Sequence, residues 1–263
     1  MPFELKPTPL HPLPRLGAAL GMKRDRLWIK RDDLTAPAGG GNKARKLRVL
    51  VADALAQGAD CLVTGGGAQS NHARMTAAVA NMAGLSCELV LSGSPDERTG
   101  NVLLDVMLGA NLTWLDRPGL PYEELEEAIE SRSRELAAEG RKPYGIPIGG
   151  SSALGASGYV AAARELVEQL DPELVVVASA SGGTHAGLVA GFGSYGRVTG
   201  VDVGARPDVG VAVERLAAEA AGIAGLPAPS GGCRLDSEHV GGGTGCPTRQ
   251  SARPCSRPRE KRA

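Results

Sequence analysis

The chain has 263 residues, enough for one large or two modest domains, because domains usually contain roughly 100–200 residues. Its 29 basic and 29 acidic side chains cancel, and only 3% of the residues are aromatic, so neither a general attraction to nucleic acid nor a base-stacking surface is predicted. No apolar run approaches the roughly 20 residues of a membrane span, and no apolar leader follows Met1. We therefore expect a soluble, cytoplasmic protein without nucleic-acid or membrane partners.

From residue 47 onward, short apolar runs alternate with helical patterns, which predicts an α/β fold with mainly parallel sheets flanked by helices. The first series has expected strands at 61–67, 87–93 and 111–116 and expected helices at 71–84, 100–110 and 122–140. The second has expected helices at 153–170, 184–193 and 208–222 and expected strands at 173–181 and 197–203. The Pro- and Gly-rich stretch 142–158 between them is the best candidate for a passage between domains.

The end of the chain, residues 249–263, breaks this order. It has six basic residues, two prolines and no periodic apolar face, so we expect it to be disordered, with a basic nucleic-acid-binding arm as the alternative. The five cysteines lack C-x-x-C spacing, which favours free thiols in a reducing compartment. A metal site of Cys233, Cys246, Cys255 and His239 has irregular ligand spacing, so no metal is expected.

A lysine stands at the start of a predicted helix in the stretch GGGNKARKL, residues 39–47. The helix has an apolar stripe with core-facing spacing, made of Leu47, Leu50, Val51, Ala54 and Leu55. Lys43 lies four residues before this stripe and points to the same side, whereas Arg45 points nearly opposite. Burial and the positive end of the helix dipole both lower the pKa of such an amine and make it a better nucleophile. The alternative is a lysine that extends to solvent or pairs with Asp32 or Asp33.

The stretch GGGAQSNHAR, residues 65–74, follows a predicted strand and opens a helix. The inward side of that helix is expected to include Met75, Val79 and Met82. Ser70 and Asn71 are natural N-cap residues, and free N–H groups at a helix start bind anions. His72 alone fits a structural hydrogen bond better than a catalytic base. Four consecutive polar residues could together hold a substrate carboxylate: Gln69, Ser70, Asn71 and His72.

The stretch SGGTHAG, residues 181–187, lies between an apolar strand and another helix. Its glycines let the backbone approach a ligand closely, and Ser181 and Thr184 add hydroxyls, so we predict a phosphate-binding turn. Its spacing is neither that of a P-loop nor that of G-x-G-x-x-G. One ligand fits all three motifs: a phosphorylated aldehyde linked to Lys43, such as pyridoxal phosphate, beside an amino-acid substrate.

Four stretches in order carry a resemblance to a known family: RDDLTAPAGGGNKARKL, VTGGGAQSNHARMTAA, GRKPYGIPIGGSSALGASGY and SGGTHAGLVAGF. From about residue 4 to 248 the chain resembles the D-cysteine desulfhydrase and 1-aminocyclopropane-1-carboxylate deaminase family of fold type II pyridoxal phosphate enzymes. The resemblance implies a two-domain tryptophan synthase β-like fold, usually a homodimer, with the cofactor between the domains. We expect a large domain at 1–45 and 157–248, a small domain at 46–156, and a tail at 249–263.

By this resemblance, Lys43 is the Schiff-base lysine and general base, Asn71 bonds the phenolic oxygen of the cofactor, and Ser70 contacts the substrate carboxylate or assists proton transfer. The residues implied to hold the phosphate are Ser181, Gly182, Gly183 and Thr184. The deaminase branch tends to carry glutamine where His72 and His185 stand, which favours β-elimination on D-cysteine to pyruvate, ammonia and hydrogen sulfide. The enzymatic alternatives are the deaminase and a cysteate sulfo-lyase.

The chain also departs from the family pattern. Thr244 stands where an active-site tyrosine is usual, Gly242 replaces a proline, and Ala180 replaces a glycine at the edge of the phosphate-binding turn. The family continues for several elements past Thr248, so the end of this chain resembles a frameshifted or truncated sequence. A non-catalytic remnant is therefore a second hypothesis. A dinucleotide-dependent reductase is more distant, because no acidic ribose partner follows a proper glycine fingerprint.

Overall fold

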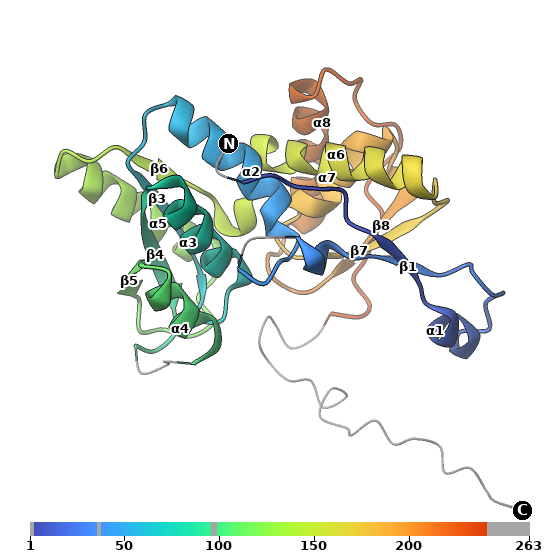
Figure 1. The fold of residues 1–263 in the computed structure, drawn as a ribbon, viewed down its shortest axis with the longest axis horizontal. Coiled ribbons are helices and arrows are strands. Elements are labelled where there is room, and N and C mark those ends of the chain that lie inside the picture. Colours follow the sequence, from blue (N-terminus) through green and yellow to red (C-terminus); the bar gives the residue numbers. More distant parts are fainter. Residues whose placement is uncertain (1–2, 36–37, 96–98, 241–263) are drawn as a thin grey trace, which may run out of the picture.

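The computed structural model describes residues 3–35, 38–95 and 99–240. They form two separate parallel sheets, each with its own helices, and one long helix, α2 (Lys43–Ala56), lies between the two halves (Figure 1). The predicted α/β fold with parallel sheets flanked by helices is therefore confirmed.

The first sheet has the strand order β5-β4-β3-β6, and all its neighbouring strands are parallel. Its strands are β3 (Cys61–Gly67), β4 (Ser86–Ser92), β5 (Asn111–Trp114) and β6 (Pro143–Gly145). Its helices are α3 (Asn71–Ala83), α4 (Gly100–Met107) and α5 (Tyr122–Ala138). Strand β6 and the 3-10 turn η2 (Ile148–Gly150) lie inside the stretch that the sequence predicted as a joint between domains.

The second sheet contains three parallel strands among the described residues, in the order β7-β8-β9. The strands are β7 (Val175–Ser179), β8 (Val198–Asp202) and β9 (Leu235–Asp236), with the 3-10 turn η3 (Tyr195–Arg197) before β8. The helices are α6 (Ala153–Gln169), α7 (Gly183–Phe192) and α8 (Val209–Ile223). The N-terminal part adds an antiparallel pair, β1 (Leu10–Pro12) and β2 (Trp28–Lys30), with α1 (Pro14–Ala19) between them and η1 (Asp32–Leu34) after them.

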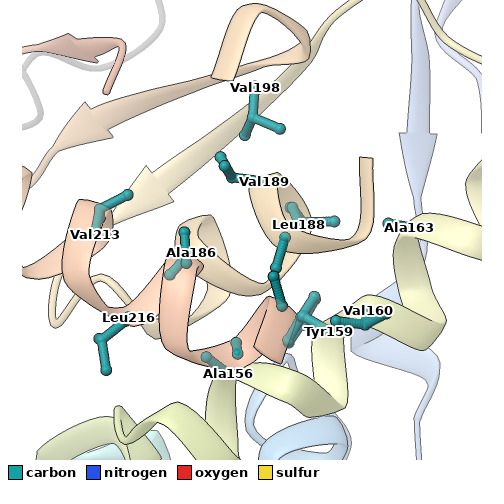
Figure 2. Packing of buried hydrophobic residues seen from close by; sticks show 14 of the residues in the cluster. Ala156, Tyr159, Val160, Ala163, Ala186, Leu188, Val189, Val198, Val213 and Leu216 are labelled. Carbon is teal, nitrogen blue, oxygen red and sulfur yellow. The ribbon is translucent and has the colours of Figure 1, made fainter. Parts of the chain in front are cut away.

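The core beside the second sheet is formed by α6, α7 and α8 (Figure 2). Small residues let α6 and α7 approach closely: a Cβ on Gly187 of α7 would lie 2.1 Å from the carbonyl oxygen of Ala156, and one on Gly191 would lie 2.5 Å from Cβ of Ala163. Val213 and Leu216 of α8 close the cluster, and full burial of such side chains stabilises the fold by about 1.5–3 kcal/mol each. The loop after β7 leads directly into this tightly packed group of helices.

Helix α2 belongs to the core of the first sheet, and its predicted stripe is largely confirmed. Leu47, Leu50, Val51 and Ala54 are buried, but Leu55 is 39% exposed, because the helix ends one residue later at Ala56. A second expectation also fails at a helix end: Met75 and Val79 of α3 are buried, whereas Met82, in its last turn, is 48% exposed. Among the described residues, no helix combines the length and apolar character that crossing a membrane requires.

Helix α4 contains a buried acid. Asp105 has no exposed surface, and neither carboxyl oxygen accepts a hydrogen bond from the described residues. Burial raises the pKa of Asp105 to about 7, although the charge of Arg74 opposes the change. A raised pKa means that the folded state loses stability as the pH rises from the ordinary value of an aspartate toward this value.

Asp105→Asn is therefore expected to stabilise the protein by about 1–3 kcal/mol at neutral pH. Because both states hold a protonated carboxyl in acid, the gain should vanish near pH 4 and grow as the pH rises to 7. Urea unfolding of both proteins at several pH values measures it. A gain that is constant across this range would contradict the raised pKa of Asp105.

Candidate functional site

Lys43 is the first residue of α2 and is half-buried. Its Nζ donates a hydrogen bond to Oδ1 of Asn42 at 3.3 Å, and burial lowers its pKa to about 8. The two carboxylates that could have paired with it are bound elsewhere: Asp32 pairs with Arg45 and Asp33 with Arg31. The alternative of a lysine neutralised by Asp32 or Asp33 is therefore wrong.

A second lysine lies one turn further along α2 and is completely buried. The Nζ of Lys46 donates to Oγ of Ser151 at 3.3 Å, and no carboxylate of the described residues pairs with it. Burial, and then the positive charge of Lys43, lower the pKa of Lys46 well below its usual value. Two amines thus share a region in which no described carboxylate balances their charge, and an anion bound there would favour their protonated forms.

The glycine-rich turn after β7 faces these amines. A pocket is lined by Asn42, Lys43, Lys46, Ala178, Ala180, Ser181, Gly182, Gly183, Thr184 and His185, and the empty space in it and at its mouth is about 220 Å³. It lies at the carboxyl end of β7, where ligands usually bind in open parallel sheets.

Hydrogen bonds tie the two sides of this pocket together. Asn42 Nδ2 donates to Oγ1 of Thr184 at 2.9 Å, and Ser151 Oγ accepts from the backbone N–H of Gly183 at 3.2 Å. The hydroxyls of Ser151 and Ser181 are 2.7 Å apart. The backbone of Gly182 has a φ angle of +87°, which residues with a side chain rarely adopt. A Cβ atom on Gly183 would lie 2.6 Å from Oγ of Ser151. Glycine is therefore required at both of these positions.

The pocket has the chemistry of a phosphate site. It combines N–H groups at the start of α7, the hydroxyl groups of Ser181 and Thr184, and two amines of lowered pKa. A phosphate would supply the missing negative charge, and an aldehyde on the same ligand could react with the amine of Lys43. The residues present therefore fit a phosphorylated aldehyde such as pyridoxal phosphate.

The start of α3 presents the other predicted polar residues. Ser70 is the N-cap, and its Oγ accepts from the backbone N–H of Ala73 at 3.2 Å, which confirms the predicted cap. Asn71 is exposed and begins the helix. Gln69 has both ends of its side-chain amide bound, Nε2 to the carbonyl oxygen of Thr99 and Oε1 to the N–H of Asn101. Neither Ser70 nor Asn71 lines the pocket at the glycine-rich turn.

His72 is buried and serves the structure. Thr64 donates its hydroxyl proton to the carbonyl oxygen of Ile146, so Nε2 of His72 must be the donor to Thr64 Oγ1 at 3.0 Å. Burial, followed by the charges of Lys43 and Lys46, lowers the pKa of His72 well below its usual value. The neutral ring then has no proton on Nδ1 to offer a carboxylate. These contacts support the structural role of His72, and its contact with a substrate carboxylate stays a prediction.

Several residues singled out in the sequence lie outside the part of the chain that the structure describes. Two of the three positions at which the chain departs from the family pattern, Gly242 and Thr244, lie outside the described residues, whereas the third, Ala180, lines the pocket. The tail 249–263 and two of the suggested metal ligands, Cys246 and Cys255, also lie outside the described residues. Within the described part of the chain, no group of three or more metal-binding side chains is found, and His239 instead contacts Asp236 at 3.0 Å.

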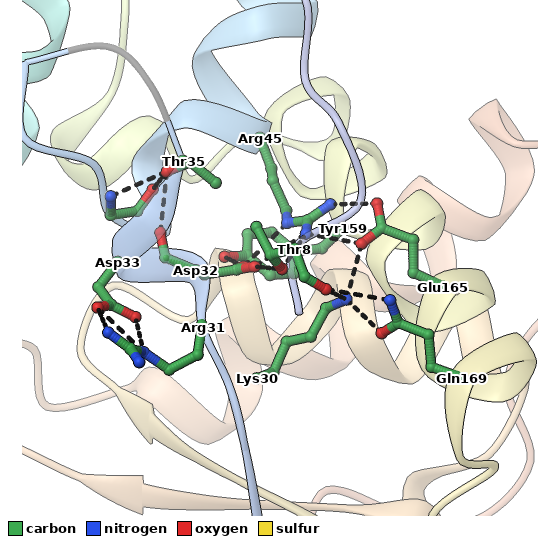
Figure 3. A network of polar contacts seen from close by, with 11 residues as sticks. Thr8, Lys30, Arg31, Asp32, Asp33, Thr35, Arg45, Tyr159, Glu165 and Gln169 are labelled. Carbon is green, nitrogen blue, oxygen red and sulfur yellow. Dashed lines mark hydrogen bonds and ion pairs between the residues drawn. The ribbon is translucent and has the colours of Figure 1, made fainter. Parts of the chain in front are cut away.

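An ion-pair network fixes the start of α2 (Figure 3). Arg45, whose side chain is 2% exposed, binds Asp32 with Nη2 at 2.8 Å and Glu165 with Nη1 at 2.7 Å. Asp32 also accepts from Tyr159 at 2.8 Å, and Lys30 pairs with Glu165 at 2.9 Å. Helical spacing placed Arg45 nearly opposite Lys43, and Arg45 is buried as well, because α2 is covered on both sides. The network holds Lys43, two residues earlier, in place.

Sequence analysis missed two residues that line the pocket, Asn42 and Lys46, and also Ser151, which hydrogen-bonds to the pocket residues Lys46, Ser181 and Gly183. Lys46 lies three residues after Lys43, so helical spacing could have placed both amines on one side of α2. Ser151 lies about a hundred residues away from Lys46 in sequence, and no local pattern indicates that it meets Ser181.

The fold and the site together place the chain in the fold type II class of pyridoxal phosphate enzymes. A solved structure described as an "ACC deaminase homologue" superposes with a TM-score of 0.78 at 38% sequence identity, covering 88% of this chain and 71% of that chain. The apo form of diaminopropionate ammonia lyase from Escherichia coli shares the fold alone, with a TM-score of 0.61 at 17% identity, over 80% of this chain and 63% of that chain.

The chain belongs to the family described as "Pyridoxal-phosphate dependent enzyme", whose model matches residues 2–249. The D-cysteine desulfhydrase of Salmonella typhi is 47% identical over 196 residues, which cover 71% of this chain and 58% of the relative. The D-cysteine desulfhydrase of Salmonella schwarzengrund is 45% identical over 226 residues, covering 81% of this chain and 64% of the relative. The chain thus spans about three fifths of the length of these relatives.

Proposed function

We propose that this protein is a pyridoxal phosphate-dependent lyase that converts D-cysteine and water to pyruvate, ammonia and hydrogen sulfide. The observation that carries the proposal is the pair of amines, Lys43 and Lys46, that face a glycine-rich turn while no described carboxylate pairs with either. The similarity to proteins named D-cysteine desulfhydrase, at 45–47% identity, supports the choice of substrate.

Within this proposal, the cofactor's phosphate is bound by the turn residues Ser181, Gly182, Gly183 and Thr184, with Lys46 as the buried cation. Lys46 is held toward the turn by its hydrogen bond to Ser151, which also contacts Ser181 and the N–H of Gly183. Charge-assisted hydrogen bonds to phosphate are about twice as strong as neutral ones. Phosphate binding therefore supplies the counter-charge that this part of the chain lacks.

Lys43 is proposed as the residue that holds the cofactor covalently and, with its Nζ free, removes the proton from Cα of the substrate. A pKa of about 8 leaves much of this amine unprotonated near neutral pH, as a general base requires. When bound, the cofactor withdraws electrons from Cα and so makes that proton acidic. Asn71 would donate to the cofactor's phenolic oxygen, and Ser70 would lie near the substrate carboxylate. Gln69 and His72, bound within the protein, would shape this region.

The proposal extends to domains, assembly and compartment. We propose that the two sheets mark the two domains expected at 46–156 and at 1–45 with 157–248. A second copy of the chain is the proposed partner, because α4 exposes four apolar side chains: Leu103, Leu104, Val106 and Met107. A cytoplasmic location is supported by the free thiols of Cys61, Cys87 and Cys233.

The test is an assay of the purified protein saturated with pyridoxal phosphate. D-cysteine should yield sulfide and pyruvate in equal amounts, and L-cysteine serves as the stereochemical control. Release of 2-oxobutanoate from 1-aminocyclopropane-1-carboxylate would instead support the deaminase, which the 38% identical solved structure keeps as the second candidate. Release of sulfite from cysteate would identify a sulfo-lyase. A protein that binds the cofactor and turns over none of these substrates would contradict the proposed function.

A further inference from the structure

Asn101, the second residue of α4, joins α4 to the start of α3, two helices that pack side by side (Figure 1). Its Nδ2 donates to the carbonyl oxygen of Gln69 at 2.8 Å and to Oδ1 of Asn71 at 3.1 Å. Its Oδ1 accepts from Nη1 of Arg74 at 3.1 Å. Its backbone N–H donates to Oε1 of Gln69 at 2.9 Å. None of the motifs found in the sequence gave Asn101 or Arg74 a function.

The orientation of the Asn101 amide is fixed from two directions. A guanidinium has donors only, so Arg74 requires the oxygen of Asn101 on its side. A backbone carbonyl has an acceptor only, so Gln69 requires the nitrogen on the other side. Both requirements agree, and a flipped Asn101 would lose both hydrogen bonds.

This orientation determines that of Asn71. Because Asn101 offers it an N–H group, Asn71 must turn its oxygen toward Asn101. Its Nδ2 therefore points the other way, and no described residue accepts a hydrogen bond from it. An amide nitrogen in this position can donate to an anionic oxygen of a ligand, whereas the flipped amide would present an oxygen and repel it.

Arg74 extends the same chain of contacts to the lysine loop. Its Nη2 donates to the carbonyl oxygen of Gly40 at 3.2 Å, three residues before Lys43. One guanidinium thus connects the loop that precedes Lys43 with the residue that orients Asn71. Arg74 therefore supports both residues that would contact the ring system of the cofactor, Lys43 on α2 and Asn71 on α3.

We propose that Asn101, held by Arg74, is a positioning residue that makes Asn71 present an N–H donor to the phenolic oxygen of the cofactor. The inference rests on the proposed function, because it needs bound pyridoxal phosphate. A donor at this oxygen stabilises its anion and lowers the pH at which the lysine-linked cofactor loses its proton. That pH is measured from the absorption band of the bound cofactor, without any substrate.

Asn101→Asp is the informative substitution, because it keeps the shape and places an oxygen where the nitrogen was. The new carboxylate keeps the contact with Arg74 and accepts from Asn71, which turns the oxygen of Asn71 toward the cofactor. The titration midpoint of the absorption band is expected to rise by about one pH unit, and cofactor affinity to fall about tenfold. In an Asn71→Ala background the same substitution should shift the midpoint no further.

Asn81→Asp is the matched control. Asn81 also lies on α3 and bonds to the residue that follows α4, through Nδ2 and the carbonyl oxygen of Leu108 at 3.3 Å, but at the far end of the helix. A merely structural role of the α3–α4 contact predicts that the two variants lose thermal stability without moving the titration midpoint. Should Asn101→Asp not fold, Asn101→Ala removes the donor and is expected to shift the midpoint in the same direction by a smaller amount.

The outcomes separate this inference from the proposed function. A wild-type protein that develops no cofactor absorption band contradicts the proposed function itself. A wild-type protein that develops the band, with an unchanged midpoint in the folded Asn101 variant, overturns the positioning role alone. A shift in the Asn101 variant that persists in the Asn71→Ala background overturns it too, because Asn101 would then act by another route.

Discussion

Lys43→Ala is expected to lower D-cysteine turnover by at least about 10³-fold and to abolish the absorption band of the lysine-linked cofactor. The substitution removes both the covalent attachment and the proposed base. Because the glycine-rich turn and Lys46 remain, the variant should still bind pyridoxal phosphate without a covalent link. Turnover is measured as sulfide release, and borohydride reduction followed by mass spectrometry should locate the cofactor on Lys43 in the wild type and on no residue in the variant.

Lys46→Met is the matched control, because it removes the other amine of the pocket. It should weaken cofactor affinity while leaving the covalent link to Lys43 possible. Loss of this buried amine should also stabilise the cofactor-free protein near neutral pH, since burial penalises its charged form and lowers its pKa. If Lys43→Ala and Lys46→Met had the same spectrum and affinity, the division of roles between the two amines would be wrong.

The lowered pKa of Lys43 adds a pH dependence to this prediction. Its amine loses its proton around pH 8 rather than near the ordinary 10.5. The rate at which added cofactor attaches to the cofactor-free protein should therefore rise with pH and be half-maximal near pH 8. A rate that keeps rising toward pH 10 would show that burial does not lower this pKa.

Local sequence patterns predicted the strands and helices well where apolar residues recur. Strand β4 and helix α8 are examples, because their spacing of buried side chains is visible in any short window. Strand β6 has the sequence Pro-Tyr-Gly and offers no such pattern. Its place is set by pairing with β3, from Cys61 to Val63, about eighty residues earlier. Contacts of that range leave no signal in the segment itself.

The candidate site shows the same limit. Helical phase correctly indicated that Lys43 is turned inward, since the apolar stripe of α2 lies in the same helix. The same argument placed Arg45 nearly opposite Lys43 but did not predict that Arg45 would be buried too. It considers one buried face of the helix, whereas α2 also packs against α6. The acid that pairs with Arg45 there, Glu165, is 120 residues away.

Arg45→Met is expected to lower the free energy of unfolding by about 3–5 kcal/mol at neutral pH. The substitution keeps most of the side-chain volume but leaves Asp32 without its cation and Glu165 with Lys30 alone. Burial raises the pKa of both carboxyls. In the wild type Arg45 outweighs burial, together with Lys30 at Glu165 and with Thr8 and Tyr159 at Asp32, and both pKa values lie below the ordinary 3.8 and 4.5. Urea unfolding of wild type and variant measures the loss.

The pH dependence of this loss distinguishes an ion-pair effect from a packing effect. A carboxyl with a lowered pKa stabilises the fold above its ordinary pKa and loses that contribution as the pH falls through the folded value. The difference between wild type and Arg45→Met should therefore be largest near neutral pH and narrow below about pH 4. A packing defect would leave the difference constant. Arg31→Met is the control: its pair with Asp33 is exposed, so the unfolding midpoint should hardly change.

Arg45 also bears on the site, because it lies between Lys43 and Lys46 on the first turn of α2. Its partners belong to η1 and α6, so the network ties the helix start to the half of the fold that carries the glycine-rich turn (Figure 3). Weakening that tie should let the two amines move relative to the turn. Arg45→Met is therefore expected to bind pyridoxal phosphate less tightly even where most of the protein is folded, and Arg31→Met to bind it as the wild type does.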